Sequence, residues 1–453
     1  MTDTMEKITG MTDEMLEKLE RLVKHNSQRG EPAEGKPFGE GPAAALAEGL
    51  AIAEEMGFAT VNMDNYCGYA EMGEGKDIIG IAAHLDIVPA GEGWNTDPFT
   101  LCREGDTVYG RGVSDDKGAV IASLYAMQLV RESGVPLTKR VRLIMGCAEE
   151  TGSECMRHYM ANAEPVTCGF TPDGNFPGIH GEKGGMSMLA RSKRTKILSM
   201  DGGFVSNAVC NRCVTRVSAG DVDGEKLKEA LAATALRSFS VTEADGVLTI
   251  ETVGVAAHAS TPLLGVNAAG CTMAALAAAG MEDDFVAFYN SHIGTACDGS
   301  GVGLKLSDEY GELTMNNGIV KTENGVITCT LDIRTPVTFS EEQLRAACRG
   351  KLEDEGGCIE ILHVGKPLFY PRDSRLVQDL YQAYVQVTGD TETQPMVIGG
   401  GTYAKAVPGI IAFGCAFPGR DNHIHDANES LSIPELQQQV AIYAQAILNM
   451  LQS

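Results

Sequence analysis

The stretch DIIGIAAHLDIV, residues 77–88, decides the fold because it is almost continuously apolar and has a histidine and an aspartate near its end. Such a run predicts a strand that is buried on both faces. A helical pattern follows at 119–133, and a second apolar run, RVRLIMGCAEE at 140–150, ends in two glutamates. Strand, helix and strand in this order predict a parallel α/β unit, in which ligands bind outside the carboxyl ends of the strands.

The rest of the chain predicts a second domain inserted into the first. Helical spacing recurs at 13–25 and 42–56, and the chain closes with a long helix from Ile433. Between them, residues 184–365 alternate β-rich stretches with short helices, which is typical of an α+β domain. A chain of 453 residues also exceeds what one hydrophobic core usually organises. We therefore expect one domain from 1–183 and 366–453, and an inserted domain at 184–365.

Charge and composition exclude several kinds of partner. With 36 basic and 61 acidic residues the formal net charge is −25, which would repel nucleic acids and anionic membranes. The amino-terminal residues are too polar for a signal peptide, and no apolar run approaches the roughly 18 residues of a membrane span. Thirteen irregularly spaced cysteines fit reduced thiols. These features predict a cytoplasmic protein that binds neither nucleic acid nor membrane.

Histidines and carboxylates cluster where the predicted strands end. The clusters are His84-Leu-Asp86, Asp115-Asp116 within GRGVSDDKG, Glu149-Glu150, Asp173 in TPDGNFP and His425 in HDANE. Each alone is a weak signal, because such groups are common in solvated loops. Two zinc ions with a shared carboxylate need five ligands, which two imidazoles and three carboxylates of these clusters can supply: His84, His425, Asp115, Glu150 and Asp173. Asp86 and Glu149 then remain for ligand orientation and general-base catalysis.

These motifs, in this order and at these intervals, resemble the co-catalytic zinc peptidases that include aminoacylase, glutamate carboxypeptidase and carnosinase. The additional stretches FPGIHGEKGG, GGGTYAK and FPGRDNHIH, at 176–185, 399–405 and 417–425, are most similar to the bacterial dipeptidase V branch. The resemblance runs from about residue 13 to the last helix. It implies a catalytic domain with a mainly parallel central sheet flanked by helices, and an inserted α+β lid.

The resemblance also implies a role for each residue of the five clusters. Asp115 would bridge two Zn²⁺ ions, which Mn²⁺ or Co²⁺ could replace, and its peptide bond to Asp116 would be cis. The remaining ligands would be Glu150 and His425 on one ion, and His84 and Asp173 on the other. Asp86 would orient His84. Glu149 would take a proton from the water or hydroxide between the metals and pass it to the leaving amine.

Further residues are implied to contact the substrate. His258, in GVAAHASTP, would stabilise the oxyanion of the tetrahedral intermediate, although a buried core histidine is the alternative. Asn207 and Arg334 would bind the substrate, and the guanidinium suits a peptide carboxylate unless Arg334 is only a surface charge. The backbone of Gly400, Gly401 and Thr402 would approach a carboxylate, since this glycine run lacks the spacing of a P-loop.

The expected function is hydrolysis of short peptides, above all unblocked dipeptides, with β-Ala-Xaa substrates included. An aminoacylase or a succinyl-diaminopimelate desuccinylase would use the same metal core, so the substrate pocket alone distinguishes them. A metal-binding relative without activity is disfavoured, because it would not need Glu149 as a base. The long insert holds both His258 and Arg334, so we expect one chain to complete its own site as a monomer.

Overall fold

The computed structural model describes residues 2–452, and the chain divides into two compact units. The terminal unit comprises the chain up to Gly181 and from Tyr370 onward, and the inserted unit comprises Glu182–Phe369. The predicted insert at 184–365 falls within the inserted unit.

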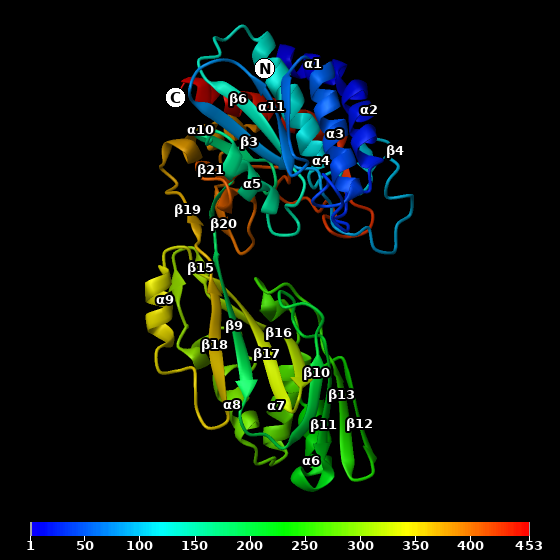
Figure 1. The fold of residues 1–453 in the computed structure, drawn as a ribbon, viewed down its shortest axis with the longest axis vertical. Helices are drawn as coiled ribbons and strands as arrows, with labels where there is room; N and C mark the ends of the chain where they lie inside the picture. Colours follow the sequence, from blue (N-terminus) through cyan, green and yellow to red (C-terminus); the bar gives the residue numbers. More distant parts are fainter. Residues whose placement is uncertain (1, 453) are drawn as a thin grey trace. The chain divides into compact units, whose positions relative to one another are not determined.

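The terminal unit is built from helices around a central sheet (Figure 1). Its helices are α1 (Thr2–Gly10), α2 (Thr12–Val23), α3 (Glu40–Glu55), α4 (Lys117–Glu132), α5 (Glu154–Asn162), α10 (Arg375–Thr388) and α11 (Ile433–Gln452), with a 3-10 turn at Tyr403–Lys405. The strands of the central sheet are β1 (Ala59–Met63), β2 (Cys67–Met72), β3 (Ile78–His84), β6 (Arg140–Gly146), β7 (Cys168–Thr171), β8 (Ile179–Glu182), β20 (Met396–Ile398) and β21 (Ile410–Ala412). A small separate sheet contains β4 (Cys102–Glu104), β5 (Thr107–Tyr109) and β22 (Ser430–Ser432).

The centre of the sheet is parallel, as expected from the sequence. Among these strands of the terminal unit the order is β1-β2-β6-β3-β7-β21-β8, with β20 beside β8. The β6-β3-β7-β21 strands run parallel, whereas β1, β2 and β8 add antiparallel neighbours on either side. His84 lies opposite Gly146 in the register of β3 and β6. The loops that leave these two strands therefore start at the same edge of the sheet.

Helix α4 is packed firmly in place next to that edge of the sheet. It packs against β3 and β6 and against helices α2 and α11. Most of its side chains are buried, including Val120, Ile121 and Leu124. Burial of each large apolar side chain contributes roughly 1.5–3 kcal/mol to folding. Because α4 begins at Lys117, this packing also fixes the loop that precedes it.

The inserted unit is an antiparallel sheet with helices. The sheet follows the order β12-β13-β11-β10-β16-β17-β9-β18. Its strands are β9 (Gly184–Ser192), β10 (Ile197–Gly202), β11 (Arg212–Ser218), β12 (Ser238–Ala244), β13 (Val247–Val253), β16 (Thr314–Glu323), β17 (Val326–Thr335) and β18 (Gly357–Val364). The other elements are α6 (Gly224–Ala232), α7 (Ala268–Ala278), α8 (Asp284–His292), α9 (Glu341–Cys348), the hairpin of β14 (Ser307–Asp308) and β15 (Gly311–Glu312), the short β19 (Leu368–Phe369), and 3-10 turns at Ala219–Asp221, Pro262–Leu264 and Ser300–Val302. Helix α7 packs on β11 and β13, and α8 packs on β18.

Two glycines explain where elements of the inserted unit end earlier than the sequence pattern suggests. The β-rich stretch VLTIETVGVAA at 247–257 forms a strand only to Val253; at Gly254 the backbone passes so close to Val266 that a side chain would lie 1.9 Å from its carbonyl oxygen. The helical pattern at 340–355 ends at Cys348, just before Gly350 with a φ of +76°.

Among the described residues, no helix is long and apolar enough to cross a membrane.

Candidate active site

Asp115 lies at the centre of the clustered histidines and carboxylates. It follows β5 in the loop before α4, is 8% exposed, and is joined to Asp116 by a cis peptide bond. His84, at the end of β3, places its Nε2 2.9 Å from Oδ1 of Asp115. His425, in the loop before β22, places its Nε2 2.9 Å from Oδ2. The two imidazoles thus face the two oxygens of one carboxylate.

Two further carboxylates complete the two sides of this arrangement. Glu150 Oε1 lies 3.1 Å from Nε2 of His425, on the same side as Oδ2 of Asp115. Asp173 Oδ2, in the loop after β7, lies 4.0 Å from Nε2 of His84. The five residues that the sequence predicted as ligands therefore gather at one edge of the sheet, in two groups that share Asp115.

Glu149 occupies the same edge. One oxygen of Glu149, one of Asp173 and a ring nitrogen of His84 all lie within 4.8 Å of one another, a spacing that would also hold a metal ion. Burial, and then the charge of Asp173, raise the pKa of Glu149 well above its ordinary value. A carboxyl group with a raised pKa is suited to accept and release a proton near neutral pH.

Asp86 has a different set of contacts from the one that the sequence suggested. Its two carboxylate oxygens accept hydrogen bonds from the backbone amides of Glu149, at 3.0 Å, and Glu150, at 3.1 Å. Nδ1 of His84 lies 2.9 Å from the backbone carbonyl of Asp86 and 3.6 Å from its carboxylate. Asp86 therefore orients His84 mainly through its main chain, while its carboxylate holds the two glutamates.

The electrostatics of the cluster favour a bound cation. Hydrogen bonds with Asp115 and then Glu150 raise the pKa of His425 to about 10. For His84, burial opposes protonation, but hydrogen bonds to Asp115 and Asp86 outweigh it and raise the pKa. The negative potential that stabilises these protons would equally stabilise a metal ion in their place.

The donor set also fits such an ion chemically. Neutral imidazole nitrogen and carboxylate oxygen are ligands of zinc and of neighbouring divalent metals. The five side chains supply two nitrogens and three carboxylates, and the shared Asp115 allows two ions to be held close together. We take this cluster as a candidate metal centre.

A pocket of about 690 Å³ opens beside the two glutamates. It is lined by Glu149, Glu150, Gly152, Ser153, Arg157, Gly401, Thr402, Lys405 and Ala406. Of the predicted glycine run, Gly401 and Thr402 line this pocket, whereas Gly400 is outside its lining and its carbonyl accepts a hydrogen bond from Lys405 at 3.4 Å. The pocket adjoins the candidate metal ligands and so offers room for a small substrate.

The three predicted residues of the inserted unit gather at one end of its sheet. Ala208 and His258 form a β-bridge, and the backbone amide of Ala259 donates to the carbonyl of Asn207, so Asn207 and His258 lie on paired segments. Thr314 donates to the carbonyl of Ala259 at 3.1 Å and lies opposite Arg334 in the sheet register.

The three side chains differ in their exposure and in their hydrogen bonds. Asn207 and His258 are exposed, which excludes the core-histidine alternative for His258, and Nδ1 of His258 lies 2.7 Å from the hydroxyl of Ser260. Arg334 is mostly buried and forms two hydrogen bonds to the carboxylate of Asp332, at 2.7 and 3.1 Å. Arg334 is therefore held by a fixed partner and is not a free surface charge.

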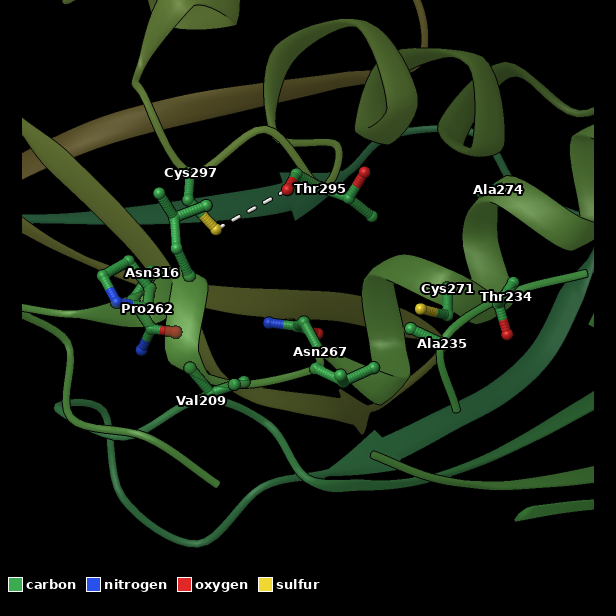
Figure 2. A pocket seen from close by; sticks show the side chains of 13 residues that line it. Val209, Thr234, Ala235, Pro262, Asn267, Cys271, Ala274, Thr295, Cys297 and Asn316 are labelled. Atoms are coloured by element: carbon green, nitrogen blue, oxygen red, sulfur yellow. Dashed lines mark hydrogen bonds between the residues drawn. The ribbon is translucent and has the colours of Figure 1, made fainter. Parts of the chain in front are cut away.

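A second pocket, of about 340 Å³, lies within the inserted unit (Figure 2). Figure 2 shows Asn316 and Pro262 at one side of it, Cys271 and Thr234 at the other, and Asn267 between them. None of its lining residues carries a charge or a metal-binding imidazole or carboxylate. We assign the chemistry to the pocket beside Glu149 and Glu150, because it adjoins the candidate metal centre.

Sequence reasoning gave no role to two buried residues near the cluster, Arg111 and Glu429. Both belong to quoted motifs, GRGVSDDKG and HDANE, and each is 1% exposed. They form an ion pair at 2.8 Å. Their presence in the motifs was the only signal available, because contacts between residues more than 300 positions apart cannot be read from spacing.

The comparisons with known proteins place this site in a family. The family model "Peptidase family M20/M25/M40" matches residues 80–449. The curated protein "Putative dipeptidase YtjP" of Bacillus subtilis is 35% identical over 91% of this chain and 91% of its own length. The protein "Putative dipeptidase SSP1012" of Staphylococcus saprophyticus is 32% identical over 98% of each chain.

Solved structures share the fold. Human carnosine dipeptidase 1 matches 100% of this chain and 99% of its own, with a TM-score of 0.56 at 16% identity. The dipeptidase Dug1p of Saccharomyces cerevisiae matches 100% and 98%, with a TM-score of 0.55 at 15% identity. At these identities the likeness concerns the fold alone. With the family match over most of its length and relatives above 30% identity, this chain is a hydrolase of peptide bonds that belongs to peptidase family M20/M25/M40.

Proposed function

We propose that this peptidase is a dipeptidase that hydrolyses unblocked dipeptides, with β-Ala-Xaa among them, at a centre of two zinc ions. The assignment to peptidases rests on the family, and the names of the relatives from B. subtilis and S. saprophyticus support the narrower dipeptidase activity. The observation that carries the metal assignment is the position of His84 and His425 on the two oxygens of Asp115, each at 2.9 Å.

We assign the ligands in two sets. His84, Asp115 and Asp173 would hold one ion, and His425, Asp115 and Glu150 would hold the other. When bound, the two ions would supply Lewis acidity toward the scissile carbonyl and lower the pKa of water in the site. Mn²⁺ and Co²⁺ accept the same donors and would be alternatives to zinc.

Glu149 would act as the general base and then as the general acid. Its carboxylate would take a proton from the attacking water and deliver it to the amine that leaves when the peptide bond breaks. The place of Glu149 in the lining of the 690 Å³ pocket, next to the proposed ligand Glu150, supports this role. Asp86 would keep the Glu149 carboxylate in position through the hydrogen bond to its backbone amide.

The remaining candidate residues would bind substrate. His258 would donate to the oxyanion that forms at the attacked carbonyl, with Asn207 beside it. The Arg334 guanidinium would bind the terminal carboxylate of the dipeptide, with Asp332 fixing its orientation. Backbone groups of Gly401 and Thr402 would contact the substrate in the pocket beside Glu149.

A substrate panel tests the proposal. The zinc-loaded enzyme is incubated with unblocked dipeptides, β-alanyl dipeptides, N-acetylated amino acids and N-succinylated diamino acids, and the released amino acids are quantified. We expect turnover of the unblocked dipeptides and little of the acylated compounds. Efficient hydrolysis of acylated amino acids without hydrolysis of dipeptides would replace the dipeptidase assignment by an aminoacylase or desuccinylase.

A further inference from the structure

Glu429 connects the loops that carry the candidate metal ligands. It lies four positions after His425, immediately before β22, and its side chain is 1% exposed. Its Oε1 accepts hydrogen bonds from the backbone amides of Ser114, at 2.9 Å, and Asp115, at 3.0 Å. Its Oε2 accepts from the amide of Gly112, at 2.9 Å, and from Nη1 of Arg111, at 2.8 Å. Both carboxylate oxygens are thus engaged by the loop that ends in Asp115.

The main chain around Glu429 reinforces this connection. The amide of Gly110 donates to the carbonyl of Glu429 at 3.1 Å, and the hydroxyl of Ser114 donates to the carbonyl of Ser430 at 2.8 Å. Ser430 also pairs with Tyr109 in the small sheet of β22 and β5. The segment after His425 and the segment before Asp115 therefore form one hydrogen-bonded structure.

Arg111 extends the connection to the loop that follows His84. Its Nη2 donates to the carbonyls of Pro89, at 3.4 Å, and Ala90, at 3.3 Å, and its guanidinium lies over the ring of Trp94 at 5.2 Å. Arg111 and Glu429 are both buried, so each charge depends on the other for compensation. The ion pair joins the loop that follows His84 to the loops that carry Asp115 and His425.

Resting on the metal centre of the proposed function, we propose that Glu429 is a positioning residue that holds Asp115 and His425 in metal-binding geometry before any metal arrives. It touches neither substrate nor metal. It acts through the backbone amide of Asp115 and through the four-residue link to His425. Because Asp115 is shared by both ligand sets, the loss of Glu429 weakens the binding of both ions together.

The test compares zinc affinity in variants of the full-length protein stripped of metal by chelation. Glu429→Gln keeps the shape of the side chain but replaces one acceptor oxygen by a donor amide that faces donors, and Glu429→Ala removes both acceptors. Glu71→Gln is the matched control, because Glu71 pairs with the buried Arg142 at 2.6 Å through strands β2 and β6, away from the ligands. Zinc binding is measured by competition calorimetry, and folding by circular dichroism and thermal unfolding of the apoprotein.

We expect Glu429→Gln to bind both zinc ions about 10- to 100-fold more weakly than wild type, the range for residues that orient metal ligands. Glu429→Ala should bind them more weakly still, and Glu71→Gln should bind them as wild type does. Excess zinc should restore turnover of Glu429→Gln with an unchanged KM, which a general loss of structure would not allow.

Other outcomes overturn the inference in distinguishable ways. Unchanged zinc affinity in folded Glu429→Gln would refute the positioning role and leave the metal centre intact. An equal loss in Glu71→Gln would show only a general effect of breaking a buried ion pair. Failure of both Glu429 variants to fold, with Glu71→Gln folded, would assign Glu429 to folding. Wild-type protein that binds no zinc would refute the proposed function itself, and this inference with it.

Discussion

His84 and Asp115 in the terminal unit are held differently from Asn207 and His258 in the inserted unit. In the terminal unit, His84 is fully buried, Asp115 is 8% exposed, and both are fixed by contacts within that unit. In the inserted unit, Asn207 and His258 are exposed. The proposed metal ligands contact one another within the terminal unit, so the candidate metal centre needs no ligand from the inserted unit. Changes in the terminal unit should therefore affect metal binding or chemistry, and changes in the inserted unit should affect activity alone.

The largest effect is expected for Glu149→Gln. This change removes the proton acceptor with little change in shape, so turnover should fall by about 10²- to 10⁴-fold, the usual range for general acid–base catalysis. Metal content, measured by atomic emission, should stay at the wild-type value, because Glu149 is not one of the five assigned ligands. An active Glu149→Gln enzyme would transfer the role of base to another group, with Glu150 the first to test.

A somewhat smaller effect is expected for His258→Ala. Removal of one donor to an oxyanion costs about 10²- to 10³-fold in kcat. Because His258 belongs to the inserted unit and is exposed, zinc affinity and thermal stability should not change. Zinc affinity is measured by calorimetry, and kcat by steady-state kinetics. Loss of zinc binding in this variant would contradict the expectation that residues of the inserted unit do not affect metal binding.

Arg334→Lys should act mainly on KM. Lysine keeps the positive charge but cannot form the two parallel hydrogen bonds that a guanidinium offers to a carboxylate. We expect KM for dipeptides to rise by roughly 10-fold, equivalent to the loss of about one hydrogen bond to a charged group. A dipeptide amide, which lacks the terminal carboxylate, serves as the control substrate. It should be hydrolysed poorly and equally by both enzymes.

Mixing two variant chains is expected to have no effect on activity. If one chain completes its own site, a mixture of inactive His258→Ala and Glu149→Gln chains should recover no activity over that of the separate proteins. Light scattering at the assay concentration should give the mass of one chain, 48.0 kDa. Recovered activity in the mixture would mean that one chain supplies the inserted unit of another, and the monomer proposal would fail.

Much of the fold could be predicted because local pattern and burial agree. The apolar run at 77–88 became the fully buried strand β3, and the run at 140–150 became its parallel neighbour β6. The carboxyl ends of such strands meet at one edge, so the proximity of His84 and Glu150 also followed from the pattern. The early end of the strand at Val253 did not, because it depends on the close approach of Val266 to Gly254.

Roles that depend on distant contacts were harder to predict. Glu429 and Arg111 are separated by 318 residues in sequence, and their motifs do not reveal that the two side chains meet. The contact of the Asp86 carboxylate with the amides of Glu149 and Glu150 likewise appears only in three dimensions. Residue types and spacing predicted which groups gather, and the fold was needed to find what holds them in place.

The proposed function requires that Asp115 joins two metal ions into one catalytic centre. The direct measurement is zinc content per chain, determined as activity returns when zinc is titrated into chelated enzyme, for wild type and for Asp115→Ala. We predict that wild-type activity reaches its plateau at two zinc ions per chain, and that Asp115→Ala binds neither ion tightly and stays inactive. Full activity of the wild type at one ion per chain, or one tightly bound ion in Asp115→Ala, would contradict the shared centre.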